Sequence, residues 1–182
     1  RQLKILYDGE TKTTERFVIA HRWANTLWSY SRWDRAIEIL EMAINEYRKE
    51  SKGVLTSYAN SVFNAYISYL TNRKRFIRAE KTIFAELKRP ANDQQIYWFR
   101  QRLYQLYNNA LSRRGEVSLG SGQTLYAAIE RMLIDELKGL KSPNHFSNLI
   151  SYLTSCYQTA KNQKLKGVVE NLRAFAFDVF PT

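Results

Sequence analysis

Apolar residues recur along most of this chain at steps of three and four, the spacing that gathers them on one face of an α-helix. Between residues 13 and 31, one stripe is formed by Phe17, Ala20, Trp23, Ala24 and Leu27. The same spacing predicts eight helices, over residues 13–31, 32–50, 54–72, 74–88, 93–114, 123–140, 143–161 and 163–180. We therefore expect an all-α fold.

Residues that cap or stop helices separate these stretches. Thr13 or Thr14 can cap the first helix, and Pro90 stops the fourth, because a proline disfavours helical geometry in the residue before it. Ser142 and Pro143 open the seventh helix, with the proline at the first helical position. Residues 115–122 hold three of the seven glycines and form the longest predicted loop.

The beginning of the chain does not follow the helical spacing. Leu3, Ile5 and Tyr7 alternate with polar residues, which fits either a short strand or the tail of a helix whose earlier part is missing. The chain starts at Arg1 rather than at a methionine, so the sequence also leaves open whether it is a fragment of a longer protein.

A motif of four residues occurs twice, 43 residues apart and without a gap. Three large side chains are followed by a small one, namely Trp23, Leu27, Trp33 and Ala36 in the first copy and Tyr66, Leu70, Phe76 and Ala79 in the second. Self-similarity at a fixed step marks a repeat architecture, in which each helix pair buries its apolar face on the next. We expect four pairs, over residues 13–50, 54–88, 93–140 and 143–180, in a single domain covering residues 1–182.

The first copy resembles the tetratricopeptide repeat, which has a small residue in its first helix and an aromatic–alanine–large–alanine series in its second. Ala24 fits the small residue, and the series is Trp33, Ala36, Leu40 and Ala43. The second copy keeps Phe76, Ala79 and Ile83 but has Ile67 and Glu86 where the family has small residues. The resemblance implies a right-handed α-solenoid of antiparallel helix pairs that acts as a scaffold for a partner.

The charge of the chain narrows the choice of partner. It has 28 Lys and Arg against 17 Asp and Glu, a formal net charge of +11. This balance favours an acidic partner, which can be a nucleic acid, an anionic membrane surface or an acidic protein, although a basic solvated surface would give the same count. No stretch is apolar enough to span a membrane and no signal peptide opens the chain, so we expect a cytoplasmic protein without a membrane partner.

The sequence predicts no catalytic residue, no metal ligand and no cofactor. His21 and His145 lie far apart without a ligand pattern around them, and the glycine-rich stretch 115–122 lacks the Lys-Ser/Thr ending of a phosphate-binding loop. Cys156 is the single cysteine and lies in an apolar run, which is typical of a small buried residue. We therefore expect that the protein is not an enzyme.

The resemblance also implies where a partner would lie, because the first helix of each pair in this family lines a concave groove. In this register the groove residues are His21, Arg22, Asn25, Asn64, Ser68, Arg102, Gln105 and Asn109. The set contains no acidic residue, and asparagine and arginine can hold an extended peptide by its backbone amides or its carboxylates. The alternative interpretation is a polar surface without a ligand.

A second set of basic residues is predicted near the turns, consisting of Arg73, Lys74, Arg75, Arg78, Arg113 and Arg114. If the turns share one edge, these residues form a ridge that could bind nucleic acid through its phosphates. Basic residues at the carboxyl ends of helices are also favoured by the helix dipole, which is the competing explanation.

We expect a protein- or peptide-binding scaffold or sensor module that recognises an acidic or extended partner in the groove. Two alternatives remain open at this point: a helical repeat that binds nucleic acid through the basic ridge, and a homo-oligomerisation module. The oligomeric state and the identity of the partner are not predicted.

Overall fold

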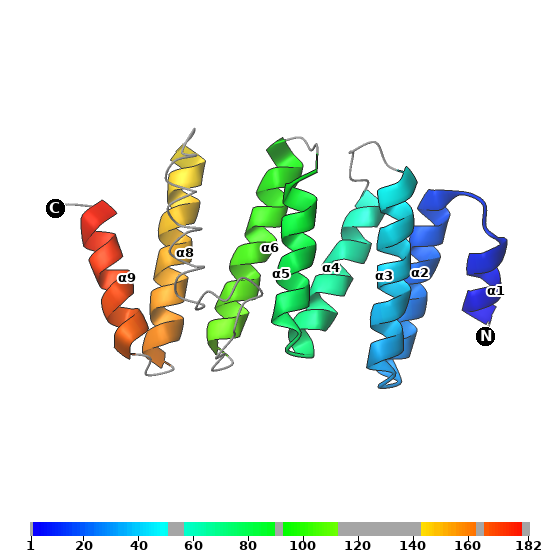
Figure 1. Cartoon of the computed structure of the whole chain (residues 1–182), viewed down its shortest axis with the longest axis horizontal. Helices are drawn as coiled ribbons and strands as arrows, with labels where there is room; N and C mark the ends of the chain where they lie inside the picture. Colours follow the sequence, from blue (N-terminus) through cyan, green and yellow to red (C-terminus); the bar gives the residue numbers. More distant parts are fainter. Residues whose placement is uncertain (1, 51–56, 90–92, 113–142, 163–165, 180–182) are drawn as a thin grey trace. The chain divides into compact units, whose positions relative to one another are not determined.

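The computed structural model describes residues 2–50, 57–89, 93–112, 143–162 and 166–179. Eight helices fall within these ranges (Figure 1): α1 (Gln2–Gly9), α2 (Thr13–Ser29), α3 (Trp33–Glu50), α4 (Ser57–Asn72), α5 (Phe76–Leu87), α6 (Asp93–Ser112), α8 (Pro143–Asn162) and α9 (Lys166–Val179). No strand occurs in the described residues, so the all-α prediction is confirmed for them. The helix predicted over 123–140 lies outside the described residues.

The chain divides into two compact units. Arg1–Arg75 with Thr82–Phe99 form the first unit, and Phe76–Lys81 with Arg100–Thr182 form the second. In the first unit, α2 packs on α1, α3 and α4, and α3 also packs on α4. In the second unit, α8 packs on α9. The prediction of a single domain over the whole chain stays a prediction.

A ladder of aromatic rings forms much of the core of the first unit. The ring of Tyr47 on α3 lies 6.0 Å from that of Phe17 on α2 and 5.7 Å from that of Phe63 on α4. Phe63 in turn meets Phe99 of α6 edge to face, with ring centroids 5.5 Å apart. Four helices are thus joined through one continuous line of edge-on or tilted ring contacts, a favourable arrangement for aromatic side chains.

Small residues let the helices of this unit approach one another, as the repeat pattern predicted. Four alanines, Ala20, Ala24, Ala36 and Ala43, are completely buried. The 43-residue step follows from long helices, since α2 has 17 residues and α3 has 18.

The first residues of the chain form helix α1, so the helical alternative for the beginning of the chain is correct. Tyr7 is buried, whereas Ile5 and Leu6 are 63% and 56% exposed. The apolar alternation therefore does not mark a buried strand face. One aromatic residue, rather than the whole stripe, attaches this short helix to the rest of the unit.

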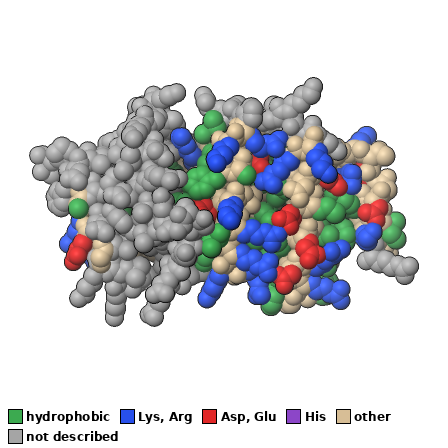
Figure 2. Space-filling view, viewed as in Figure 1, with side chains coloured by type: hydrophobic (Ala, Val, Ile, Leu, Met, Phe, Trp, Pro, Cys, Tyr) green, Lys and Arg blue, Asp and Glu red, His purple; other side chains and the backbone are tan. Residues whose placement is uncertain are grey.

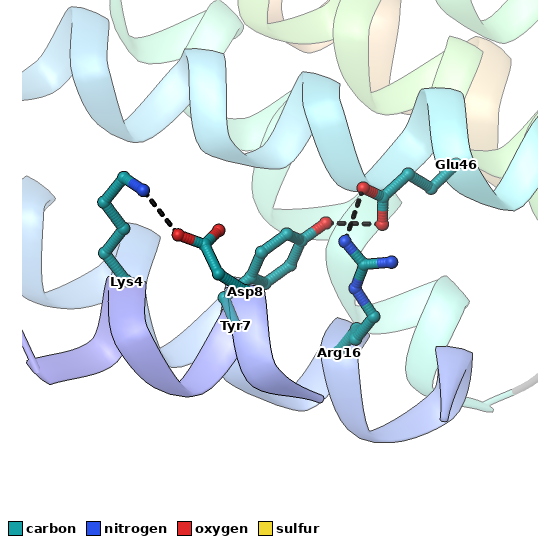
Figure 3. A network of polar contacts seen from close by, with 5 residues as sticks. All are labelled: Lys4, Tyr7, Asp8, Arg16 and Glu46. Atoms are coloured by element: carbon teal, nitrogen blue, oxygen red, sulfur yellow. Dashed lines mark hydrogen bonds and ion pairs between the residues drawn. The ribbon is translucent and has the colours of Figure 1, made fainter. Parts of the chain in front are cut away.

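A polar network fixes Tyr7 in place (Figure 3). Its hydroxyl donates to Oε2 of Glu46 at 2.5 Å, and Nη2 of Arg16 donates to Oε1 of the same carboxylate at 2.9 Å. Burial raises the pKa of Tyr7, and the hydrogen bond to Glu46 raises it further, so the phenol stays protonated. The network connects α1, α2 and α3 through one shared carboxylate.

The prediction that a threonine caps the first long helix is wrong. Helix α2 begins at Thr13, and Lys12 occupies the cap position in extended geometry without a side-chain hydrogen bond to the helix. Glu10 partly replaces the missing cap at the start of α2, because its Oε1 accepts a hydrogen bond from the backbone N–H of Lys12 at 2.8 Å. Glu15 in the first turn adds a favourable interaction with the helix dipole.

The turns after α2 and α4 are built in the same way, 43 residues apart. Ser31 and Lys74 both adopt left-handed backbone geometry, with φ of 58° and 56°. In the first turn, Ser31 N–H donates to Trp28 O at 3.0 Å, and Arg32 N–H donates to Leu27 O at 2.9 Å. The second turn has the same two bonds, from Lys74 N–H to Thr71 O at 3.0 Å and from Arg75 N–H to Leu70 O at 2.8 Å. This is the Schellman arrangement, so the repeat found in the side chains is also present in the backbone.

Glycine at either left-handed position is expected to stabilise the fold. Left-handed geometry costs a residue with a Cβ roughly 1 kcal/mol, so Ser31→Gly or Lys74→Gly should raise the free energy of unfolding by about 0.5–1 kcal/mol in urea titrations. Asn72→Gly is the matched control, because Asn72 is the last residue of α4 and has helical geometry. There the change should lower the free energy by a similar amount. Equal effects at Lys74 and Asn72 would contradict this account.

The second unit combines apolar burial with a set of partly buried polar contacts. The rings of Tyr104 on α6 and Tyr152 on α8 are stacked, with centroids 4.2 Å apart. Asn108 donates to Ser155 Oγ at 2.9 Å and accepts from Thr159 Oγ1 at 2.8 Å. Cys156 is completely buried, as predicted, and burial raises the pKa of its thiol to about 11.

Candidate functional site

Five of the predicted groove residues lie on two helices of the first unit that pack on each other. His21, Arg22 and Asn25 belong to α2, and Asn64 and Ser68 belong to α4. The side chains are exposed except that of His21, which is half-buried. His21 and Asn64 occupy equivalent positions of the 43-residue repeat, as do Asn25 and Ser68. We call these five residues the α2–α4 polar surface.

Asn25 has a fixed orientation on this surface. The hydroxyl of Tyr69, on α4, donates to Asn25 Oδ1 at 2.5 Å, and Asn25 Nδ2 lies 3.3 Å from Nε2 of His21. The ring of Tyr69 is itself stacked on Trp28, with centroids 3.8 Å apart and an interplanar angle of 13°. A side-chain amide has two N–H donors and an oxygen with two lone pairs. One donor and one lone pair of Asn25 therefore remain for a ligand.

The protonation states of Tyr69 and His21 fit their hydrogen bonds to Asn25. Burial raises the pKa of Tyr69, so its hydroxyl stays a donor. Burial lowers the pKa of His21 below its ordinary value of 6.5, which favours the neutral ring at pH 7. A neutral ring protonated on Nδ1 can accept the Asn25 N–H at Nε2. The surface thus holds its asparagine through one donor and one acceptor.

The α2–α4 polar surface carries positive charge and no carboxylate. Arg22 is its only charged member, and the sequence of α4 contains no Asp, Glu, Lys or Arg. Glu15, the acidic residue of α2, lies in the first turn of that helix. The arrangement suits ligands that offer carbonyl or carboxylate oxygens.

The other three predicted groove residues belong to the second unit. Arg102 Nη1 donates to Oε1 of Gln105 at 2.8 Å, and burial lowers the pKa of this arginine. Gln105 and Asn109 are exposed, and the backbone oxygen of Asn109 accepts a hydrogen bond from Ser112 Oγ at 2.9 Å. A common groove that includes all eight residues stays a prediction.

Part of the predicted basic ridge gathers at the two turns of the first unit. The Arg73 guanidinium lies over the Trp33 ring, 4.4 Å from its centroid, and Arg75 Nη2 donates to Asp34 Oδ1 at 2.5 Å. Both contacts join the turn after α4 to the start of α3, so the two turns are neighbours. Lys74 is exposed between these arginines.

The structure does not place the remaining ridge residues relative to this cluster. Arg78 falls in the second unit, and Arg113 and Arg114 lie outside the described residues. A ridge of six residues is therefore not shown, whereas the grouping of Arg73, Lys74 and Arg75 is.

The sequence did not identify the residues that support the site. Tyr69 and Trp28 lie within stretches that the apolar spacing predicts as helices, and that spacing gives neither residue a supporting role. The repeat offered a usable signal, because a shift of 43 residues places Asn25 on Ser68, directly before Tyr69. The same shift places Arg32 on Arg75, which points to Arg32 as a further basic residue at the turns.

Comparisons with protein-family models, with curated proteins and with solved structures find no match for this chain. Within the described ranges, no group of three or more His, Cys, Asp or Glu side chains is placed to hold a metal ion. None of the helices in the described part of the chain is both long and apolar enough to cross a membrane.

Proposed function

We propose that this chain is a tetratricopeptide-like scaffold module that binds an extended, acidic peptide segment of a protein partner on the α2–α4 polar surface. The observation that carries the proposal is the exposed Asn25, which Tyr69 and His21 hold with one donor and one lone pair left over. The proposed architecture is four antiparallel helix pairs stacked as a right-handed solenoid. The equivalent turns at Ser31 and Lys74 support it, and so does the packing of α2 on both α3 and α4.

The chemistry of an extended peptide matches the groups that Asn25 presents. Each peptide unit offers one N–H and one C=O, and an asparagine amide can pair with both at once. Because two contacts already orient the Asn25 side chain, binding costs little of its rotamer entropy. On α4, Ser68 occupies the repeat position equivalent to Asn25, and Asn64 lies one helical turn before it. Both side chains are exposed and can continue the contacts with the backbone of the peptide.

Arg22 gives the surface a preference for acidic sequences. Its guanidinium is exposed and can form a bidentate pair with a carboxylate, either of a side chain or of a peptide carboxyl terminus. The absence of carboxylates from α4 removes a source of repulsion along the path of such a peptide.

Variants of Asn25 and of its hydrogen-bond partner Tyr69 test this proposal. A random peptide library should yield acidic binders, and the affinity of the best binder can be measured by calorimetry. We expect Asn25→Ala to weaken binding by about tenfold or more, because it removes two polar contacts worth roughly 1 kcal/mol each. Tyr69→Phe should weaken it by about threefold to fivefold, since the stacked ring stays while the bond that orients Asn25 is lost.

Asn45→Ala is the matched control, because Asn45 is an exposed asparagine on α3. The Asn45→Ala variant should bind the peptide with the same affinity as the unmodified chain. The proposal fails if the library yields no acidic binder, or if the Asn25 and Asn45 variants bind the peptide equally well.

A further inference from the structure

We propose that the paired turns of the first unit bind single-stranded nucleic acid. The site consists of Tyr30, Arg32 and Trp33 around the first turn and Arg73 and Lys74 in the second, and we call it the turn surface. It shares no residue with the α2–α4 polar surface, and each proposal can fail without the other.

The two turns form one continuous surface. Figure 1 shows the connection between α2 and α3 and the connection between α4 and α5 at the same lower edge of the view. The 4.4 Å contact between the Arg73 guanidinium and the Trp33 ring joins them directly. The ion pair between Arg75 and Asp34 joins them a second time. Residues 40 and 41 positions apart in the sequence are thereby brought to one site.

The surface has an excess of positive charge that its carboxylates do not cancel. Asp34 is paired with Arg75, and Glu38 is paired with Arg35 at 2.6 Å. Arg32, Arg73 and Lys74 are exposed, and no carboxylate among the described residues pairs with them.

The face of the molecule that is drawn in Figure 2 also has more basic than acidic side chains in its described part. Figure 2 shows Lys and Arg side chains over much of the described part of this face, with fewer Asp and Glu among them. Three unneutralised cations on one small surface attract a polyanion, and each one that meets a phosphate releases a counterion.

Exposed rings lie among these cations. Tyr30 is 75% exposed and Trp33 is 37% exposed. Trp28 meets Trp33 edge to face, with ring centroids 6.5 Å apart, and this contact supports the Trp33 ring. A guanidinium on an aromatic ring, as Arg73 is on Trp33, presents a second flat face on which a base can stack. Bases of a single strand have accessible faces for such stacking, whereas bases inside a duplex do not.

The backbone of the second turn, which carries two of these cations, is fixed before any ligand arrives. The N–H groups of Lys74 and Arg75 donate to Thr71 and Leu70 at 3.0 Å and 2.8 Å, which locks the left-handed turn. The charges of Arg73 and Lys74 are therefore carried on a backbone of defined geometry. A peptide of acidic residues would use the charges but would leave the exposed ring of Tyr30 without a partner. This difference favours a nucleic acid as the ligand.

Fluorescence anisotropy with labelled oligo(U) and oligo(dT) of 12 nucleotides tests the proposal on the full chain. We expect dissociation constants of roughly 1–100 µM at low salt, which increase steeply as salt is added. The double variant Arg73→Gln/Lys74→Gln should bind about tenfold or more weakly. It should also flatten the slope of log K against log salt by about 1.4, because each phosphate contact to a single strand contributes about 0.7.

Lys49→Gln/Lys88→Gln is the matched control, because it removes the same charge from exposed lysines elsewhere in the first unit. Lys49 lies at the far end of α3 from the turn, about 24 Å away along the helix axis. This control should retain the salt slope and nearly all of the affinity. A loss as large as that of the Arg73/Lys74 variant would overturn the proposal, since it would show a diffuse charge effect.

A second variant tests stacking rather than charge. Tyr30→Ser removes the most exposed ring and should weaken binding by about threefold to tenfold with an unchanged salt slope. The proposal is overturned if neither oligonucleotide binds at low salt, or if a 12-residue poly-glutamate peptide binds the turn surface more tightly than both. Preference between oligo(U) and oligo(dT) decides whether RNA or DNA is the ligand class.

Discussion

Replacing Arg48 by methionine is expected to lower the free energy of unfolding by about 3 kcal/mol, because it removes the main partner of a buried carboxylate. Glu86 is 4% exposed, and its Oε1 accepts from Arg48 Nε at 2.7 Å. Arg89 stays 3.7 Å from the other carboxylate oxygen, which keeps the cost at the lower end of what breaking a buried ion pair gives. Urea denaturation followed by circular dichroism measures the change.

Two further variants separate the loss of the pair from the loss of a surface charge. Arg35→Met breaks the ion pair between Arg35 and Glu38, whose side chains are 55% exposed for Arg35 and 56% exposed for Glu38. This change should lower the free energy of unfolding by less than about 0.5 kcal/mol. Arg48→Met/Glu86→Leu removes both the half-buried cation and the buried carboxylate, and it should recover most of the loss. The account is contradicted if the Arg48 and Arg35 single variants are equally stable.

The second large effect is expected at the centre of the aromatic ladder. Phe63 is completely buried between Tyr47 and Phe99, and Phe63→Ala should cost about 3–5 kcal/mol, since it removes the ring and leaves a cavity. Many domains have a total stability of only about 5–15 kcal/mol, so this variant should unfold at much lower urea concentration.

Phe84 provides the comparison for this prediction. It lies in the same unit but is only partly buried, so Phe84→Ala should cost about half as much. A cost below about 2 kcal/mol at Phe63 would show that the ladder is not the core that the structure indicates.

The helices could be predicted from the sequence because their apolar spacing is regular and their ends carry clear signals. The predicted stretch 32–50 agrees with α3 (Trp33–Glu50), and the stretch 74–88 contains α5 (Phe76–Leu87). The threonine cap failed because several polar residues precede α2, and local geometry decides which of them takes the cap position. The alternation in residues 3–7 was ambiguous because so short a stretch fits both periods.

Contacts between helices could not be read from the sequence. Glu86 departs from the tetratricopeptide pattern, and the reason is visible only in space, where Arg48 of α3 meets it. The contacts of the α2–α4 polar surface likewise could not be read from the sequence. The sequence identified Asn25 as a polar residue of α2, but the bond from Tyr69 depends on how α2 and α4 pack. A tyrosine on an apolar stripe gives no indication of where its hydroxyl lies.

The most direct test of the central claim is a nuclear magnetic resonance titration of the chain with an acidic peptide selected by binding. The side-chain amide resonances of Asn25 and Asn64 are predicted to shift together as the peptide is added, while that of Asn45 on α3 stays unchanged. Shifts at Asn45, or shifts confined to the turn surface with Asn25 and Asn64 unchanged, would contradict the assignment of the α2–α4 polar surface as the peptide-binding site.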